Sequence, residues 1–175
     1  MHEAFLSTAL ALTSPLNRLD VIYPHWQTKR LITPRRLDLA VKWRFFRHLL
    51  GGNDGDAVDL YRWHIEQRSG HRIAAGLPTD RWKRSVDEYV TSATALLQSL
   101  RTYGFLGPVP VDRNGELLDG SHRVACASAL GIEEIPVDRQ DRNVWAPAWD
   151  ELWFRARMTD EGVNRLITDW LWMRL

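Results

Sequence analysis

Residues 109–137 decide the fold and read Val-Pro-Val-Asp-Arg-Asn-Gly-Glu-Leu-Leu-Asp-Gly-Ser-His-Arg-Val-Ala-Cys-Ala-Ser-Ala-Leu-Gly-Ile-Glu-Glu-Ile-Pro-Val. The first three residues are β-prone, and the Asn114-Gly115 pair that follows is typical of a hairpin turn. We therefore expect residues 116–118 to return as a second strand. Residues 135–137 close the stretch as a third short strand.

A helix is expected between the second and third strands, from His122 to Leu130. Its apolar residues recur at helical spacing, and Gly131 ends it. The order strand, turn, strand, loop, helix, strand predicts an α+β fold.

The loop before this helix, from Asp119 to Arg123, has the chemistry of an anion site. Gly120 lets the backbone turn sharply and leaves room for a ligand. Ser121 and His122 stand at the helix N-terminus, where backbone N–H groups and the helix dipole favour an anion. Arg123 adds a planar cation suited to phosphate, and the Asp119 carboxylate can accept a hydroxyl proton or help to hold Mg²⁺.

A purely structural interpretation of the loop stands beside this one. Asp119 would then only cap the helix, and His122 and Arg123 would be surface side chains. Ser121 has no identifiable general base in the sequence and lies in no Gly-x-Ser-x-Gly elbow, so we do not expect a serine hydrolase.

The whole stretch resembles the ParB/sulfiredoxin-like superfamily, and the resemblance covers roughly residues 85–137. It implies a small mixed β-sheet of that type flanked by several helices. Residues 106–140 would form the nucleotide- or phosphate-binding core of a single domain that spans residues 1–175.

Branches of that superfamily differ at the loop. Sulfiredoxins carry Gly-Cys-His-Arg, and Ser121 replaces that cysteine here, which argues against a thiol-based reductase. ParB partition proteins carry a Gly-Glu-Arg-Arg type motif and a following helix-turn-helix domain, and no convincing one follows Val137. The free serine kinases carry Asp-Gly-His-His-Arg and are the most similar branch, with Ser121 in place of their first histidine.

Similarity to the kinase branch implies nucleotide-dependent phosphoryl transfer to a small hydroxylated metabolite. Asp119 and His122 would be the catalytic residues, and Gly120, Ser121, His122 and Arg123 would hold the phosphates of ATP, ADP or CTP with its Mg²⁺. We expect no metal site built from protein ligands alone. The alternative is a non-catalytic, ParB-like nucleotide-binding or DNA-associated regulatory protein.

Residues 28–105 are expected to be mainly helical. Thr33 as N-cap and Pro34 as first helical residue predict a helix that ends at Gly51. A second helix is expected over residues 56–67.

A loop over residues 70–79 should separate the second helix from a third. Ser85 and Glu88 have the spacing of a capping box, which predicts the start of the third helix. Gly104 predicts its end near Tyr103.

Three charged residues, Arg35, Asp38 and Lys42, are spaced at i, i+3 and i+7 and would share one helix face. They are our candidate substrate-binding cluster, because kinases of the similar branch draw an acidic residue from an earlier helix. The alternative is an ordinary helix ion pair between Asp38 and Lys42.

Basic residues are concentrated between Thr28 and His48, where seven Lys or Arg residues face a single acidic one. Such a patch could meet phosphates, including those of DNA, although a solvated helix face has the same composition. The whole chain has a net charge of +1, which excludes a globally basic nucleic-acid coat.

Residues 145–175 are expected to form a C-terminal helical segment. Trp145, Trp149 and Trp153 recur at every fourth residue, which predicts a helical stripe that packs on the core or forms an aromatic wall for a ligand or partner. The final helix, about residues 160–175, should dock on the domain or close a homodimer.

Length and composition set further limits. The 175 residues are enough for one domain with its own core, and the lone Cys126 excludes an internal disulfide. A reducing, cytoplasmic location fits best, and no apolar run reaches the ~20 residues of a membrane span. We expect His64 and His71 to be surface or loop residues, because neither has a partner at metal-ligand spacing.

Overall fold

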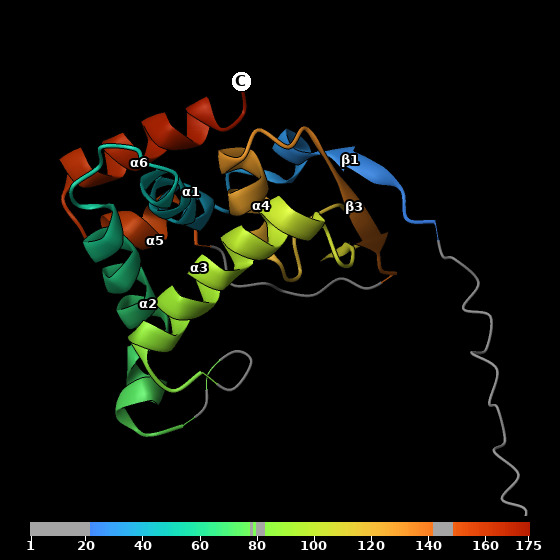
Figure 1. The fold of residues 1–175 in the computed structure, drawn as a ribbon. Helices are drawn as coiled ribbons and strands as arrows, with labels where there is room; N and C mark the ends of the chain where they lie inside the picture. Colours follow the sequence, from blue (N-terminus) through green and yellow to red (C-terminus); the bar gives the residue numbers. More distant parts are fainter. Residues whose placement is uncertain (1–21, 78, 80–82, 142–148) are drawn as a thin grey trace, which may run out of the picture.

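A helical body carries a small sheet at one side (Figure 1). The structure is a computed structural model and describes residues 22–77, 79, 83–141 and 149–175. In chain order the elements are β1 (His25–Gln27), the 3₁₀ helix η1 (Thr28–Leu31), α1 (Asp38–Leu49), α2 (Ala57–Ala74), α3 (Val86–Tyr103), β2 (Val109–Val111), α4 (Ser121–Ala129), β3 (Glu134–Arg139), α5 (Glu151–Arg155) and α6 (Asp160–Trp172). The expected α+β class is confirmed. Within the described residues, no helix is long and apolar enough to cross a bilayer.

The sheet has the strand order β1-β3-β2 and is mixed. β1 runs antiparallel to β3, whereas β2 runs parallel to β3 with Val109 opposite Val137. Parallel neighbours need a crossover connection, and α4 is part of it. Val109, Val111, Ile135 and Val137 are fully buried, so the sheet and α4 share one core.

The prediction of a second strand over residues 116–118 is wrong, because this segment forms only one antiparallel bridge, between Leu117 and Val111. The turn before it is tight, since the Asp112 carboxylate accepts the backbone N–H groups of Asn114 and Glu116, each at 2.8 Å. The chain turns towards α4 soon after Leu117, which leaves room for a single pair. The place beside β2 in the sheet belongs to β3 instead.

Helix α1 begins at Asp38, four residues later than the sequence predicts. Thr33 does not cap it, because its hydroxyl donates to the Glu116 carboxylate at 3.0 Å. The backbone of Arg36 forms a parallel bridge with Trp149, and this long-range pairing keeps the segment before Asp38 out of the helix.

The boundaries of the next two helices follow local signals in part. α2 continues to Ala74, so the loop expected from residue 70 starts later. Ile73 packs against the core, and this burial outweighs the ~1 kcal/mol that Gly70 costs within a helix. α3 starts as predicted, where the Ser85 hydroxyl accepts the N–H of Glu88 at 3.2 Å.

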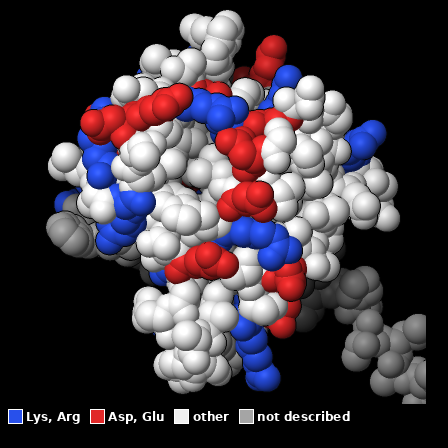
Figure 2. All heavy atoms as spheres, turned by 90° about the vertical axis from the view of Figure 1, so that its left-hand side faces the viewer, with Lys and Arg blue, Asp and Glu red and all other residues white. Residues whose placement is uncertain are grey.

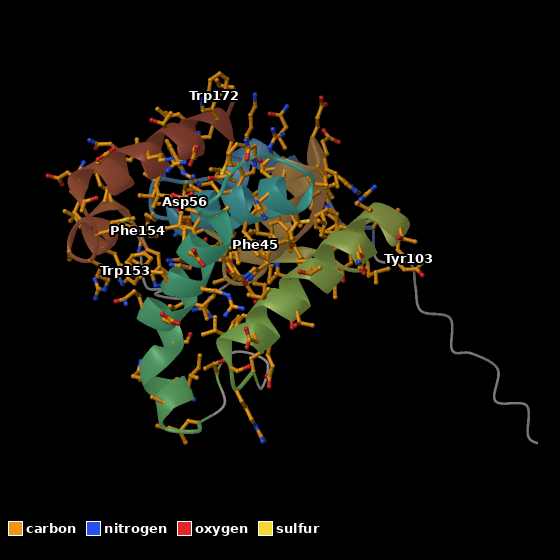
Figure 3. The ribbon with its side chains drawn as sticks, turned by 60° about the vertical axis from the view of Figure 1, so that its left-hand side comes forward. Phe45, Asp56, Tyr103, Trp153, Phe154 and Trp172 are labelled. Atoms are coloured by element: carbon orange, nitrogen blue, oxygen red, sulfur yellow. The ribbon has the colours of Figure 1, made fainter. Side chains whose placement is uncertain are left out.

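Helix α1 is the centre of the helical body and packs against α4, α2 and α6. Phe45 on α1 lies in the interior (Figure 3) and stacks on Tyr61 of α2, with 4.3 Å between ring centroids. Ala125 and Ala127 on α4 are fully buried, and such small side chains allow two helices to approach closely.

The tryptophans of the C-terminal segment do not share one helix, so the predicted stripe is wrong. Trp149 precedes α5, whose N-cap Asp150 accepts the N–H of Trp153 at 3.1 Å. Trp145 lies outside the described residues. Trp153 packs against Phe154, with 4.8 Å between ring centroids, which agrees with core packing.

Helix α6 docks on α1 as expected, through the buried Val163 and Leu166. Trp172 near its end is 63% exposed and lies at the periphery (Figure 3). Whether this end meets a second copy of the chain stays a prediction.

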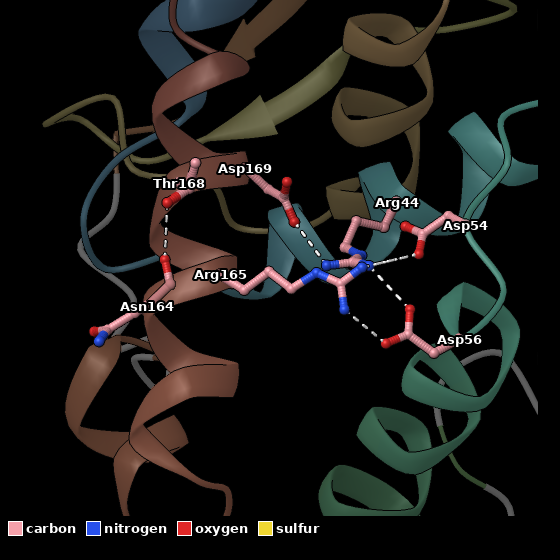
Figure 4. A network of polar contacts seen from close by, with 7 residues as sticks. All are labelled: Arg44, Asp54, Asp56, Asn164, Arg165, Thr168 and Asp169. Carbon is pink, nitrogen blue, oxygen red and sulfur yellow. Dashed lines mark hydrogen bonds and ion pairs between the residues drawn. The ribbon is translucent and has the colours of Figure 1, made fainter.

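An ion-pair network fastens α6 to α1 and to the segment before α2 (Figure 4). The buried Arg44 guanidinium contacts the carboxylates of Asp54 at 2.6 Å, Asp56 at 2.9 Å and Asp169 at 3.1 Å. Arg165 on α6 also contacts Asp54 and Asp56. Across this side of the molecule, charges of both signs are interspersed (Figure 2).

Candidate functional site

The predicted loop from Asp119 to Arg123 lines a cavity of about 390 Å³ together with residues of α2, α3 and the segment before α3. Three cationic side chains line it, from Arg68, Lys83 and Arg123. Asp119 is the sole carboxylate among the lining residues that the structure describes. The cavity therefore gathers positive charge around one acidic group at the N-terminus of α4.

Gly120 makes the sharp turn that brings the loop into this cavity. Its φ of +88° lies in the left-handed region, and a Cβ there would stand 3.0 Å from Arg123 Nη2 and 3.2 Å from Val109 Cγ1. Only glycine occupies such a position without strain. Two features therefore require glycine after Asp119: the positive φ at this position and the Arg123 side chain packed against it.

Gly120→Ala is expected to lower the free energy of unfolding by about 1–3 kcal/mol, because a side chain is forced into a left-handed, crowded position. Gly55→Ala is the matched control, since nothing lies within 4 Å of a Cβ at Gly55. We expect the control to stay within ~0.5 kcal/mol. Urea unfolding measures both variants, and equal stability of the two would contradict the assignment.

Arg123 both lines the cavity and braces the loop. Its Nη1 donates to the backbone carbonyls of Gly107 at 3.2 Å and Pro108 at 2.8 Å, directly before β2. The guanidinium is thereby held in place over Gly120. Such a fixed, planar cation is well suited to a phosphate oxygen.

A buried charge cluster lies behind the loop and includes two of the three predicted substrate-binding residues. Arg36 donates to Asp38 through Nε at 2.8 Å and Nη2 at 3.1 Å, and Lys42 donates to the same carboxylate. Lys42 Nζ also donates to Ser121 Oγ at 3.0 Å, which joins α1 to the loop. The expected ion pair from Asp38 to Lys42 is confirmed, but it is fully buried and not an ordinary surface pair.

The prediction that Arg35 belongs to this cluster is wrong. It is exposed and precedes α1, so the assumed helical spacing does not apply to it. Arg36 takes its place and anchors the cluster to the sheet side through the Leu117 carbonyl at 3.2 Å. No local pattern distinguishes the two neighbouring arginines; the bridge to Trp149 selects Arg36.

The cluster holds one carboxylate and two cations, all almost completely removed from water. Burial alone would raise the pKa of Asp38, but Arg36 and Lys42 hold it well below its usual value. Burial lowers the pKa of Lys42 to about 8, and the Asp38 charge limits that fall. The surplus positive charge therefore sits on Lys42, next to Ser121.

His122 is held from behind by Tyr61. The tyrosine Oη lies 2.8 Å from His122 Nε2. Burial, helped by Lys42, brings the pKa of His122 well below its usual value, so the imidazole is neutral near pH 7. His122 can thus offer a phosphate a neutral ring nitrogen but not a positive charge.

The position predicted for His64 is wrong, and two cations that line the cavity were not predicted. His64 was expected at the surface, yet it is fully buried, with its ring stacked on Phe154 at 5.8 Å between centroids. Burial lowers its pKa to about 3, so it packs as a neutral ring. His64 follows Tyr61 by three residues and precedes the buried Ile65, so helical spacing could have revealed its burial.

Arg68 shares that spacing, because it follows Tyr61 by seven residues along α2 and reaches the cavity. Lys83 lines the cavity from the segment before α3, and no sequence pattern predicts that it does so. Three cations of the basic stretch between Thr28 and His48 are internal and paired with carboxylates: Arg36, Lys42 and Arg44. These three side chains therefore add nothing to an exposed basic surface, and contact of this stretch with DNA stays a prediction.

Comparisons with known proteins place the chain in no family. No protein-family model matches it, and no solved structure matches it. An uncharacterized protein, ORF326b of Acidianus two-tailed virus, is 45% identical over 47 residues. The match covers 27% of this chain and 14% of the viral protein, so it spans only a small part of that relative.

Proposed function

We propose that the chain binds the phosphate groups of a nucleotide in the cavity at the Asp119–Arg123 loop and transfers a phosphoryl group to a small hydroxylated molecule. One observation carries this proposal: among the residues that the structure describes, three cations, a helix N-terminus and a single carboxylate line the same cavity. Cations and helix N-termini bind phosphate, and a carboxylate beside them can take the proton of an acceptor hydroxyl.

The size and charge of the cavity support a small anionic ligand. A volume of about 390 Å³ lies within the range of small-molecule sites. Arg68 lines the cavity from α2, Lys83 from the segment before α3 and Arg123 from α4, so a phosphate chain would meet cations from three parts of the chain. The buried surplus charge on Lys42 adds to the positive potential behind Ser121.

Asp119 is the base in this mechanism. Its Oδ1 accepts the N–H of Gly120 at 2.6 Å, which orients the carboxylate at the loop. It takes the proton of the acceptor hydroxyl as that oxygen attacks the phosphoryl group. The described residues contain no group of three or more acidic, histidine or cysteine ligands, so a nucleotide-borne Mg²⁺ would find Asp119 alone and complete its shell with phosphates and water.

The first test is a thermal-shift screen with ATP, ADP, CTP and GTP, each with and without Mg²⁺. A ligand that binds only the folded chain at ~100 times its Kd is expected to raise Tm by about 5–10 °C. Arg68→Ala should remove most of this rise. Arg123→Ala would also release the backbone carbonyls of Gly107 and Pro108, whereas Arg68→Ala removes a contact with the Trp149 ring, 5.1 Å from the guanidinium carbon to the ring centroid.

Arg101→Ala is the matched control, since Arg101 is an exposed arginine in the last turn of α3 and does not line the cavity. It should keep the full rise in Tm. Absence of a rise with every nucleotide would remove the proposal. A rise that Arg68→Ala and Arg101→Ala retain equally would place the nucleotide elsewhere.

A further inference from the structure

Ser121 lies between a buried lysine and the cavity. Lys42 Nζ is 3.0 Å from Ser121 Oγ, and the Lys42 side chain is completely buried. Ser121 itself is half-buried and lines the cavity. A ligand in the cavity can therefore reach the serine hydroxyl, while Lys42 reaches that ligand only through the serine.

The charge balance of the cluster lets Lys42 act as a base. Arg36 alone neutralises Asp38 with two hydrogen bonds, so loss of one proton from Lys42 leaves a neutral buried cluster. A lysine in a desolvated position beside another cation is poised to give up its proton, and the pKa of about 8 at Lys42 agrees with this. Neutral lysine can then activate a serine at hydrogen-bond distance.

We propose that Ser121 is a covalent phosphoryl acceptor, phosphorylated by a nucleoside triphosphate in the cavity while Lys42 removes the serine proton. This inference rests on the proposed function and gives it two steps through a phosphoserine. Nothing in the sequence pattern pointed to it, because the base lies 79 residues before the nucleophile.

In the first step, Ser121 Oγ forms a bond to the γ-phosphorus, and the bond from that phosphorus to the β,γ-bridging oxygen breaks. The nucleoside diphosphate leaves, and the serine proton passes to Lys42 Nζ. In the second step, the acceptor hydroxyl attacks the same phosphorus and gives its proton to Asp119. The bond to Ser121 Oγ breaks, and Lys42 returns the proton to that oxygen.

The surroundings of Ser121 suit the intermediate. Ser121 is the first residue of α4, where a phosphoserine benefits from the helix dipole and backbone N–H groups. Arg68, Lys83 and Arg123 line the same cavity and would pair with its charge. Protonated Lys42, paired with Asp38, stands ready as the acid for the second step.

The test incubates the full chain with ATP or CTP and Mg²⁺ over about pH 6 to 9, and follows intact mass and the modified peptide. We expect one phosphoryl group on Ser121, at a rate that rises with pH and levels off above about 8. Ser121→Ala should abolish the label. Ser128→Ala, which removes another serine of α4 outside this cavity, should keep it.

Two further variants test Lys42 as the base of the first step and Asp119 as the base of the second. Lys42→Arg keeps the cation but gives no base, since arginine does not lose its proton, and should slow labelling by ~10²–10⁴-fold. Asp119→Asn should accumulate the label, because only the second step needs that carboxylate. Nucleotide-induced Tm shifts on the same samples report binding and folding.

The outcomes distinguish failure of the phosphoserine intermediate from failure of the proposed function. If a nucleotide raises Tm but neither the wild type nor Asp119→Asn gains a phosphoryl group on Ser121, the intermediate is wrong and the proposed function stands with direct transfer. If no nucleotide raises Tm, both fall. Labelling by Lys42→Arg at the wild-type rate, or a flat pH profile in the wild type, would show that Lys42 is not the base.

Discussion

Asp119→Asn is expected to lower turnover by ~10²–10⁴-fold while nucleotide binding is retained, because an amide cannot take the acceptor's proton. Asparagine has almost the size of aspartate, and its side-chain oxygen can keep the contact with the Gly120 N–H. The cations that would hold the phosphates, Arg68, Lys83 and Arg123, are unchanged. The loss should therefore appear in the chemical step and not in affinity.

Conversion of nucleoside triphosphate to diphosphate, in the presence of a mixture of small hydroxylated metabolites, measures this turnover. Asp138→Asn is the control, because Asp138 lies on β3 and does not line the cavity. It should retain wild-type turnover. Wild-type turnover in Asp119→Asn would remove Asp119 as the base.

Asp38→Asn is expected to lower the free energy of unfolding by about 3–5 kcal/mol, which corresponds to a fall in Tm of about 6–20 °C. The substitution leaves the Arg36 and Lys42 charges buried without a counter-ion. Lys42→Met should differ sharply and stay within about 1 kcal/mol of wild type, because it leaves the Arg36–Asp38 pair neutral and complete.

Urea unfolding compares these variants with Asp87→Asn, which breaks the exposed ion pair to Arg62. That control should cost no more than ~1 kcal/mol, as exposed pairs contribute little. Equal effects of Asp38→Asn and Lys42→Met would contradict the view that Lys42 carries the surplus charge.

The pH dependence of stability follows from the same cluster. Because the pKa of Asp38 is lowered in the folded state, its contribution is present above its unfolded value, near pH 4, and is lost as the pH falls through the folded value. For Lys42 the folded pKa is also lowered, so the unfolded chain binds the extra proton between pH 8 and 10.5. Lys42 therefore contributes a rise in stability over that interval, of the order of 3 kcal/mol, which should be absent in Lys42→Met.

Local signals in the sequence were enough for the elements that surround the loop. Gly120 and Gly104 adopt positive φ, Ser85 caps α3, and the segment that follows Gly120 is helical. These features depend on backbone sterics and on hydrogen bonds between residues close in the chain, which a short stretch of sequence specifies. The prediction of an anion site at residues 119–123 likewise depends only on residues that are close in the chain.

Tertiary structure decided which distant side chains join that loop. Arg36 and not Arg35 entered the cluster because Arg36 bridges Trp149, more than a hundred residues away. Lys42 met Ser121 only because α1 packs against α4. Burial and electrostatics arise from such long-range packing, so the lowered pKa of Lys42, and with it the proposed chemistry of Ser121, cannot be derived from residues that are neighbours in the sequence.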